Sequence, residues 1–100
     1  MPYFMLKLIP PRPTFLRDAT PVELEAMGRH AAYIRSLIGE GKILAAGPVH
    51  DPSGAWGFAI ADAPDAATAD SWGKADPVVQ SGLGFRWDVF PILSLLRPEP

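Results

Sequence analysis

The sequence predicts an α+β fold of the ferredoxin-like type, with the element order β-α-β-β-α-β and an antiparallel sheet. Two observations support this prediction. Four short segments are rich in branched and aromatic residues, and two longer segments between them have helical start signals and helical spacing of apolar residues. With 100 residues, 48% hydrophobic and 20% charged, the chain is expected to form one domain over residues 1–100.

The first strand is expected at residues 3–9. The connection over 10–19 is too rich in proline for a helix or a central strand. The first helix has a complete start signal, because Thr20 can cap it, Pro21 takes its first position and Glu23 completes a capping box. Apolar residues recur along this helix at spacings of three and four and form one face: Leu24, Met27, Ala31, Ile34 and Ile38.

The next two strands form a predicted hairpin. The turn sequence at 51–54, Asp-Pro-Ser-Gly, separates a strand at 42–49 from a strand at 55–61. A second helix opens after Asp65 and runs to about Lys74. Its apolar and small residues indicate a helix that packs on the same sheet.

The C-terminal part contains the last strand. Residues 77–81 are expected to form a short extra turn that ends at Gly82, and the strand covers 83–90. Prolines flank residues 91–100, which are expected to form an extended arm. No internal repeat interrupts this order.

The predicted sheet is apolar on both faces. The first strand is apolar on both faces apart from Tyr3 and Lys7. In the last strand, Phe85, Trp87 and Val89 point one way, and the residues between them point the other way. Two helices cover only one face of a four-stranded sheet, so the second apolar face needs a partner. We therefore expect a homodimer that packs sheet against sheet.

Composition excludes several classes of function. The net charge is −2 and no lysine–arginine cluster occurs, which argues against nucleic-acid binding. The absence of cysteine excludes a disulfide framework and a thiol nucleophile, and neither histidine has metal-ligand spacing, so no metal is expected. The apolar N-terminal stretch is too short to span a membrane, and a cytoplasmic location is expected. No cofactor is expected, because Gly82 and Gly84 precede a strand and form no dinucleotide fingerprint.

Two residues are candidates for acid–base chemistry. His30 lies mid-helix beside the apolar stripe, and Asp76 precedes Pro77 after the second helix. Imidazole is the side chain whose charge changes most easily near neutral pH, and a carboxylate can orient it. The alternatives are a partly buried histidine bonded to backbone and an aspartate that only caps a short helix. If the fold brings the two together in a pocket, they form an acid–base site.

Four further residues are candidates for substrate binding. Arg12 lies in the proline-rich connection and can clamp an anionic or phenolic group, or remain a solvated charge. Arg86 alternates with aromatic residues and needs either an acidic partner or a substrate anion. Tyr33 can bind substrate through its hydroxyl or simply pack, and Trp87 either fills the core or lines the cavity.

Six segments in order resemble the YciI-like (YCII-related) proteins. They are residues 3–8, 30–33, 47–49, 51–57, 75–77 and 82–86. The resemblance implies a dimeric α/β barrel of the α+β class, located in the cytoplasm. It also implies a pocket with a histidine from the first helix and an aspartate from an Asp-Pro element, roles that fall on His30 and Asp76. Some members remove HCl from a hydroxylated ring, so the resemblance implies lyase-type proton transfer.

We therefore predict a small homodimeric enzyme without a cofactor. His30 and Asp76 would act as an acid–base pair on a small, aromatic or otherwise apolar organic molecule, in a lyase or dehydrochlorinase-like reaction. Cofactor-free oxygenation also occurs on this barrel architecture and stays open as a reaction class. Two non-enzymatic functions are the alternatives: a dimer that binds a small ligand, and a structural interaction module.

Overall fold

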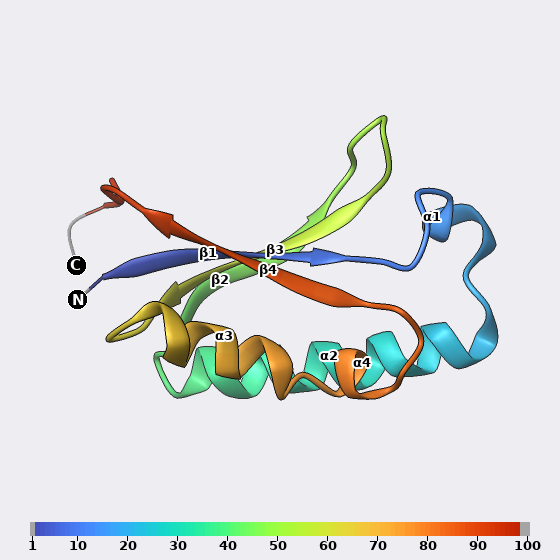
Figure 1. Ribbon diagram of the computed structural model, residues 1–100, viewed down its shortest axis with the longest axis horizontal. Helices are drawn as coiled ribbons and strands as arrows, with labels where there is room; N and C mark the ends of the chain where they lie inside the picture. Colours follow the sequence, from blue (N-terminus) through green and yellow to red (C-terminus); the bar gives the residue numbers. More distant parts are fainter. Residues whose placement is uncertain (1, 99–100) are drawn as a thin grey trace.

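A computed structural model describes residues 2–98 and confirms the ferredoxin-like order, with short extra helices (Figure 1). The elements are β1 (Tyr3–Ile9), α1 (Phe15–Asp18), α2 (Pro21–Gly39), β2 (Ile43–Val49), β3 (Trp56–Asp62), α3 (Ala66–Lys74), α4 (Pro77–Gln80) and β4 (Arg86–Ile92). The four strands form one antiparallel sheet in the order β2-β3-β1-β4. Helices α2, α3 and α4 lie along one face of this sheet, the inner face.

Every second side chain of β1 is buried on the inner face. Phe4, Leu6 and Leu8 are buried, and the β3 residues opposite the first two are Ala61 and Ala59. Because these β3 side chains are small, the helices approach the sheet closely. One buried cluster thus joins the sheet to α2 and α3.

The apolar stripe predicted for α2 is only partly buried. Ala26, Ile34 and Leu37 are buried in the core, whereas Leu24 is 58% exposed and Ile38 is 41% exposed. The helix is rotated by about one residue from the predicted orientation, and the capping-box residue Glu23 is buried in place of Leu24. Four residues of the predicted stripe instead border the open cavity described below: Met27, Ala31, Ile34 and Ile38.

Ion pairs of Arg12 hold the connection between β1 and α2. Arg12 donates to both carboxylate oxygens of Glu23, at 2.8 and 2.7 Å, and its Nε donates to Asp18 at 2.8 Å. Glu23 also accepts the backbone N–H of Thr20 at 2.8 Å, so the predicted capping box is present. These bonds, above all those from Arg12, lower the pKa of Glu23 to about 2. Arg12 and Glu23 therefore stay ionised at neutral pH. Their ion pair helps to hold the short helix α1, in a segment where the sequence predicted no helix.

The last strand is displaced from its predicted range. It begins at Arg86 rather than residue 83, because Gly82 and Gly84 adopt positive φ angles of 74° and 97° that belong to a loop. It continues through Pro91 to Ile92, and an edge strand tolerates proline because one side of it needs no ladder bonds. The predicted arm therefore starts at residue 93, and its residues 99 and 100 lie outside the described part of the chain.

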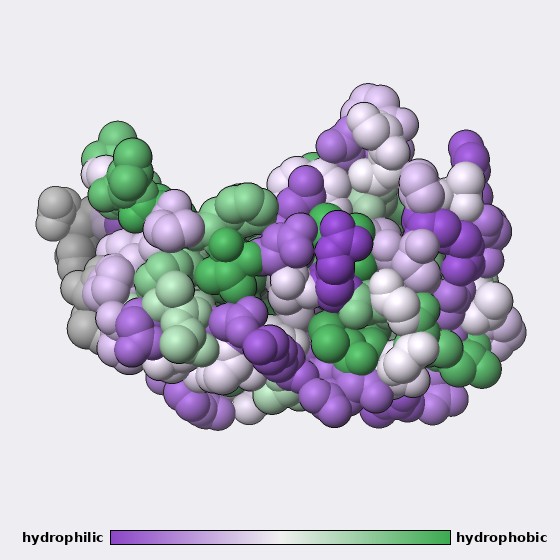
Figure 2. Space-filling view, viewed as in Figure 1, coloured by the Kyte–Doolittle hydropathy of each residue, from purple (hydrophilic) through white to green (hydrophobic). Residues whose placement is uncertain are grey.

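Within residues 2–98, no helix covers the opposite face of the sheet, the outer face (Figure 1). Ile60, Met5 and Phe90 lie side by side across three strands on this face, and Phe90 is 45% exposed. In Figure 2 the upper outline is hollowed between the β2–β3 turn and the C-terminal end, and hydrophobic residues gather along it. No helix within residues 2–98 has both the length and the apolar character needed to cross a membrane.

Candidate functional site

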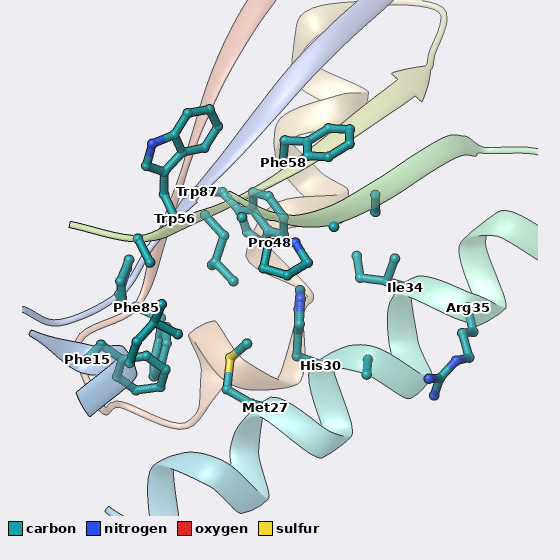
Figure 3. Close-up of a pocket in the computed structure, with 18 of the residues that line it drawn as sticks. Phe15, Met27, His30, Ile34, Arg35, Pro48, Trp56, Phe58, Phe85 and Trp87 are labelled. Carbon is teal, nitrogen blue, oxygen red and sulfur yellow. The ribbon is translucent and has the colours of Figure 1, made fainter. Parts of the chain in front are cut away.

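A cavity of about 440 Å³ lies between α2 and the sheet (Figure 3). Met27, His30 and Ile34 of α2 form one wall, and Pro48 of β2 and Trp87 of β4 stand opposite. Aromatic side chains from α1, β3 and the loop before β4 also line the cavity: Phe15, Trp56, Phe58 and Phe85. The volume lies within the usual range for sites that bind small molecules.

His30 and Asp76 meet at this cavity. The Nδ1 atom of His30 lies 2.6 Å from Oδ2 of Asp76, although the residues are 46 positions apart. Asp76 is fully buried, and the His30 side chain is 16% exposed and lines the cavity. In Figure 3 the imidazole projects from α2 into the hollow, toward Pro48 and Trp87. The carboxylate thus stands behind the imidazole rather than in the cavity.

The local sequence explains where Asp76 lies. Asp76 is the N-cap of α4, and its Oδ1 accepts the backbone N–H of Val78 at 3.0 Å, while Pro77 takes the first helical position. Its other oxygen, Oδ2, accepts the indole N–H of Trp87 at 3.2 Å. The cap therefore fixes the carboxylate in the orientation that reaches His30.

These contacts determine the tautomer of His30. A carboxylate that accepts from two N–H groups offers only acceptor oxygens, so Nδ1 of His30 must donate to it. In the neutral imidazole this leaves the lone pair on Nε2, on the side of the ring away from Asp76. The arrangement can accept a proton from a bound molecule at Nε2 and return it.

Gly73 packs against Trp87, and no sequence pattern predicted its importance. It is buried in α3, and a Cβ atom built at this position would lie 2.9 Å from two atoms of the Trp87 indole. Contacts that short are not tolerated, and the indole that bonds Asp76 is the obstructing group. A glycine in a helix otherwise weakens the helix, and here it makes room for the tryptophan.

We predict that Gly73→Ala displaces Trp87 and breaks its bond to Asp76. The melting temperature should fall by several degrees, because overpacking a core costs about 1–3 kcal/mol. Tryptophan fluorescence and thermal unfolding measure both effects. Gly28→Ala is the matched control, since it is also in a helix but has nothing within 4 Å of the added Cβ, and should be neutral or stabilising. Equal behaviour of the two variants would contradict the packing argument.

Three other predicted site residues lie away from the cavity. The Tyr33 hydroxyl donates to the carbonyl oxygen of Trp72 at 2.6 Å. Burial, together with the charges of Asp76 and Glu40, raises the pKa of Tyr33, so the hydroxyl remains a donor. Tyr33 therefore ties α2 to α3 and does not line the cavity.

Arg12 and Arg86 border a second cavity of about 360 Å³, between the proline-rich connection and the β2–β3 turn. Arg12 is paired with Glu23 and Asp18, and Arg86 Nε lies 3.5 Å from Oδ1 of the half-buried Asp88. Neither guanidinium lines the cavity that holds His30. Among the predicted substrate-binding residues, Trp87 is the one that does.

The fold and the site define a small α+β protein with an apolar cavity and a histidine–aspartate pair in its wall. Residues 1–93 match the family model of the YCII-related domain, and the chain belongs to this family. No curated protein matches the chain.

Among solved structures, the chain is similar to the 5-chloro-2-hydroxyhydroquinone dehydrochlorinase from Burkholderia phenoliruptrix AC1100, in complex with 2,5-dihydroxybenzoquinone. The two chains are 24% identical, with a TM-score of 0.58, and the match covers 86% of this chain and 89% of the other. At this identity the likeness establishes the fold.

Proposed function

We propose that the protein is an acid–base enzyme that acts on a small, apolar, hydroxylated molecule in the cavity between α2 and the sheet. The observation that supports this best is the 2.6 Å contact from His30 Nδ1 to the buried carboxylate of Asp76. This contact makes the other ring nitrogen, Nε2, the proton acceptor in a mainly apolar cavity. A positioned histidine of this kind contributes about 10²–10⁴-fold to a proton-transfer step.

The reaction class is elimination of HX from a hydroxylated aromatic ring, where X is a halide. Nε2 of His30 takes a proton from a ring hydroxyl and delivers it to the ring carbon that bears X, which gives the keto tautomer. It then takes the proton of a second hydroxyl while the C–X bond breaks and X leaves with the bonding pair. The ring loses H and X together, so the sequence needs neither an oxidant nor a reductant. The dehydrochlorinase of similar fold supports this choice.

Apolar walls suit such a substrate. Met27, Phe85 and Trp87 offer flat or adaptable surfaces to an aromatic ring. Asp76 acts as a positioning residue, because it holds the Nδ1 proton and balances the charge of the imidazolium that forms between the two steps. Burial of the Asp76 carboxylate, whose side chain is fully inaccessible, strengthens this pairing.

The test is release of chloride from 5-chloro-2-hydroxyhydroquinone by the purified protein. We expect chloride release above the uncatalysed rate, and no release from the analogue in which all hydroxyls are methylated, since it has no proton to give. The same rate with and without protein would refute the proposed reaction and favour a ligand-binding dimer. 2,5-Dihydroxybenzoquinone serves as a competing ligand in the same assay.

The functional unit is proposed to be a homodimer built on the outer face. The row formed by Ile60, Met5 and Phe90 is apolar, and no helix in the described part of the chain covers it. Burying such a face against a second copy is favourable. We predict a dimer in sedimentation equilibrium and a monomer for Ile60→Asp, because a charge in the centre of the interface is costly to desolvate. Leu24→Asp, at a 58% exposed position on α2, should remain dimeric. A monomeric wild type, or a dimeric Ile60→Asp variant, would contradict this model.

A further inference from the structure

The cavity that holds His30 has a second basic side chain, Arg35. No aspartate or glutamate lines this cavity among the described residues, although the chain has 11 acidic residues and a net charge of −2. The indole N–H groups of Trp56 and Trp87 are occupied, since they donate to Asp51 at 3.1 Å and to Asp76 at 3.2 Å. The ionisable side chains that line it are therefore His30 and Arg35 alone, within residues 2–98.

Arg35 is available for a ligand. Within residues 2–98 its guanidinium makes no ion pair and no side-chain hydrogen bond, whereas Arg12 and Arg29 bind carboxylates at 2.7 and 2.6 Å. Arg35 is exposed and borders the cavity (Figure 3). In that view its guanidinium lies outside the ring of apolar side chains, and its rotatable stem allows it to turn toward the opening.

The two basic groups lie at different points of one cavity. Arg35 follows His30 by five residues on α2, which separates the two positions by about 7.5 Å along the helix axis and by about 140° around it. Both residues nevertheless line the cavity, so a ring that contacts His30 can present its other end to the flexible Arg35 side chain at the opening. A guanidinium binds a carboxylate or another planar oxyanion through paired hydrogen bonds.

We propose that Arg35 is a specificity-determining residue that selects aromatic anions. The apolar ring occupies the cavity, its carboxylate or ring oxyanion pairs with Arg35 at the opening, and the hydroxyl at the other end meets Nε2 of His30. The position of the hydroxyl rests on the proposed function, whereas the recognition of the anion does not need turnover. A neutral ring of the same shape lacks the paired hydrogen bonds and binds more weakly.

The test compares 4-hydroxybenzoate with its neutral amide, 4-hydroxybenzamide, by calorimetry and by quenching of tryptophan fluorescence. We expect the wild type to bind the carboxylate about tenfold more tightly, which corresponds to about 1.4 kcal/mol. Arg35→Gln should remove this preference and leave the affinity for the amide within about twofold. Arg29→Gln is the matched control, because Arg29 lies on the same helix, pairs with Glu25 and does not line the cavity.

Three results would overturn the role of Arg35. They are equal affinity of the wild type for both probes, a preference for the carboxylate that survives in Arg35→Gln, and no binding of either probe. The assay for chloride release is separate from this test. Absence of chloride release with an intact anion preference would refute the reaction and support the role of Arg35. Chloride release without an anion preference would support the reaction and refute the role of Arg35.

Discussion

Asp76→Ala should lower the melting temperature by at least about 12 °C. The substitution leaves the backbone N–H of Val78 and the indole N–H of Trp87 buried without an acceptor, and each such group costs about 1–3 kcal/mol. The imidazole of His30 loses its partner as well. A total loss of about 3 kcal/mol or more in the free energy of unfolding is a large part of the stability of a domain this small. Thermal and urea-induced unfolding measure it.

Asp65→Ala is the matched control for this prediction. Asp65 also caps a helix, since its carboxylate accepts the Thr68 N–H at 2.7 Å, but it is exposed and bonds nothing else among the described residues. Loss of such a cap costs about 1 kcal/mol. If the two alanine variants unfold at the same temperature, Asp76 is only a helix cap, and the buried network around it contributes nothing.

His30→Gln should reduce the rate of chloride release by about 10²–10⁴-fold while the protein stays folded. The glutamine amide can still donate to Asp76, so the buried carboxylate keeps a partner. It has no nitrogen that takes and returns a proton, and therefore the chemical step fails. Initial rates measured beside circular dichroism separate loss of chemistry from loss of fold.

His50→Gln is the control for the His30 variant. His50 is the second histidine of the chain, and it is exposed directly after β2. Its replacement should leave the rate unchanged. A His30→Gln variant that retains wild-type turnover would rule out acid–base catalysis by the imidazole, and an equal loss in both variants would indicate a non-specific effect.

Local signals predicted the order of elements well. The start of α2 follows from the capping box of Thr20 and Glu23, and the hairpin follows from the turn before Trp56. The sequence of β1 also shows which side chains lie on each face of the sheet, because successive side chains of a strand point to opposite faces. The ends of β4 were misplaced, since Gly84 extends a loop and Pro91 is tolerated on an edge strand.

The contact between His30 and Asp76 did not follow from local pattern. These residues lie on separate elements, and only the resemblance to a family indicated that they meet in one pocket. The spacing of apolar residues along the first helix indicated that His30 flanks the apolar stripe. The same spacing carries no information about where Asp76, the N-cap of α4, lies relative to that helix. Pairing across 46 positions is a property of the tertiary fold.

The remaining site residues show the same limit. Arg12 was a candidate for substrate binding because it is a cation in a long connection, but the buried carboxylate of Glu23 binds it. Tyr33 was a candidate because its hydroxyl can bind substrate, but that hydroxyl donates to the Trp72 carbonyl oxygen in α3. Gly73 had no signal at all, because its importance comes from the indole of Trp87 packed against it. A residue type and its position in sequence do not specify which neighbour satisfies it.

The protonation of the His30 imidazole tests the central claim most directly. Nitrogen NMR of the labelled protein distinguishes the two neutral tautomers of the imidazole. We predict that the proton lies on Nδ1 and that addition of 2,5-dihydroxybenzoquinone moves the signal of Nε2. A proton on Nε2, or an Nε2 signal that the added quinone leaves unchanged, would contradict an imidazole held by Asp76 for proton transfer in the cavity.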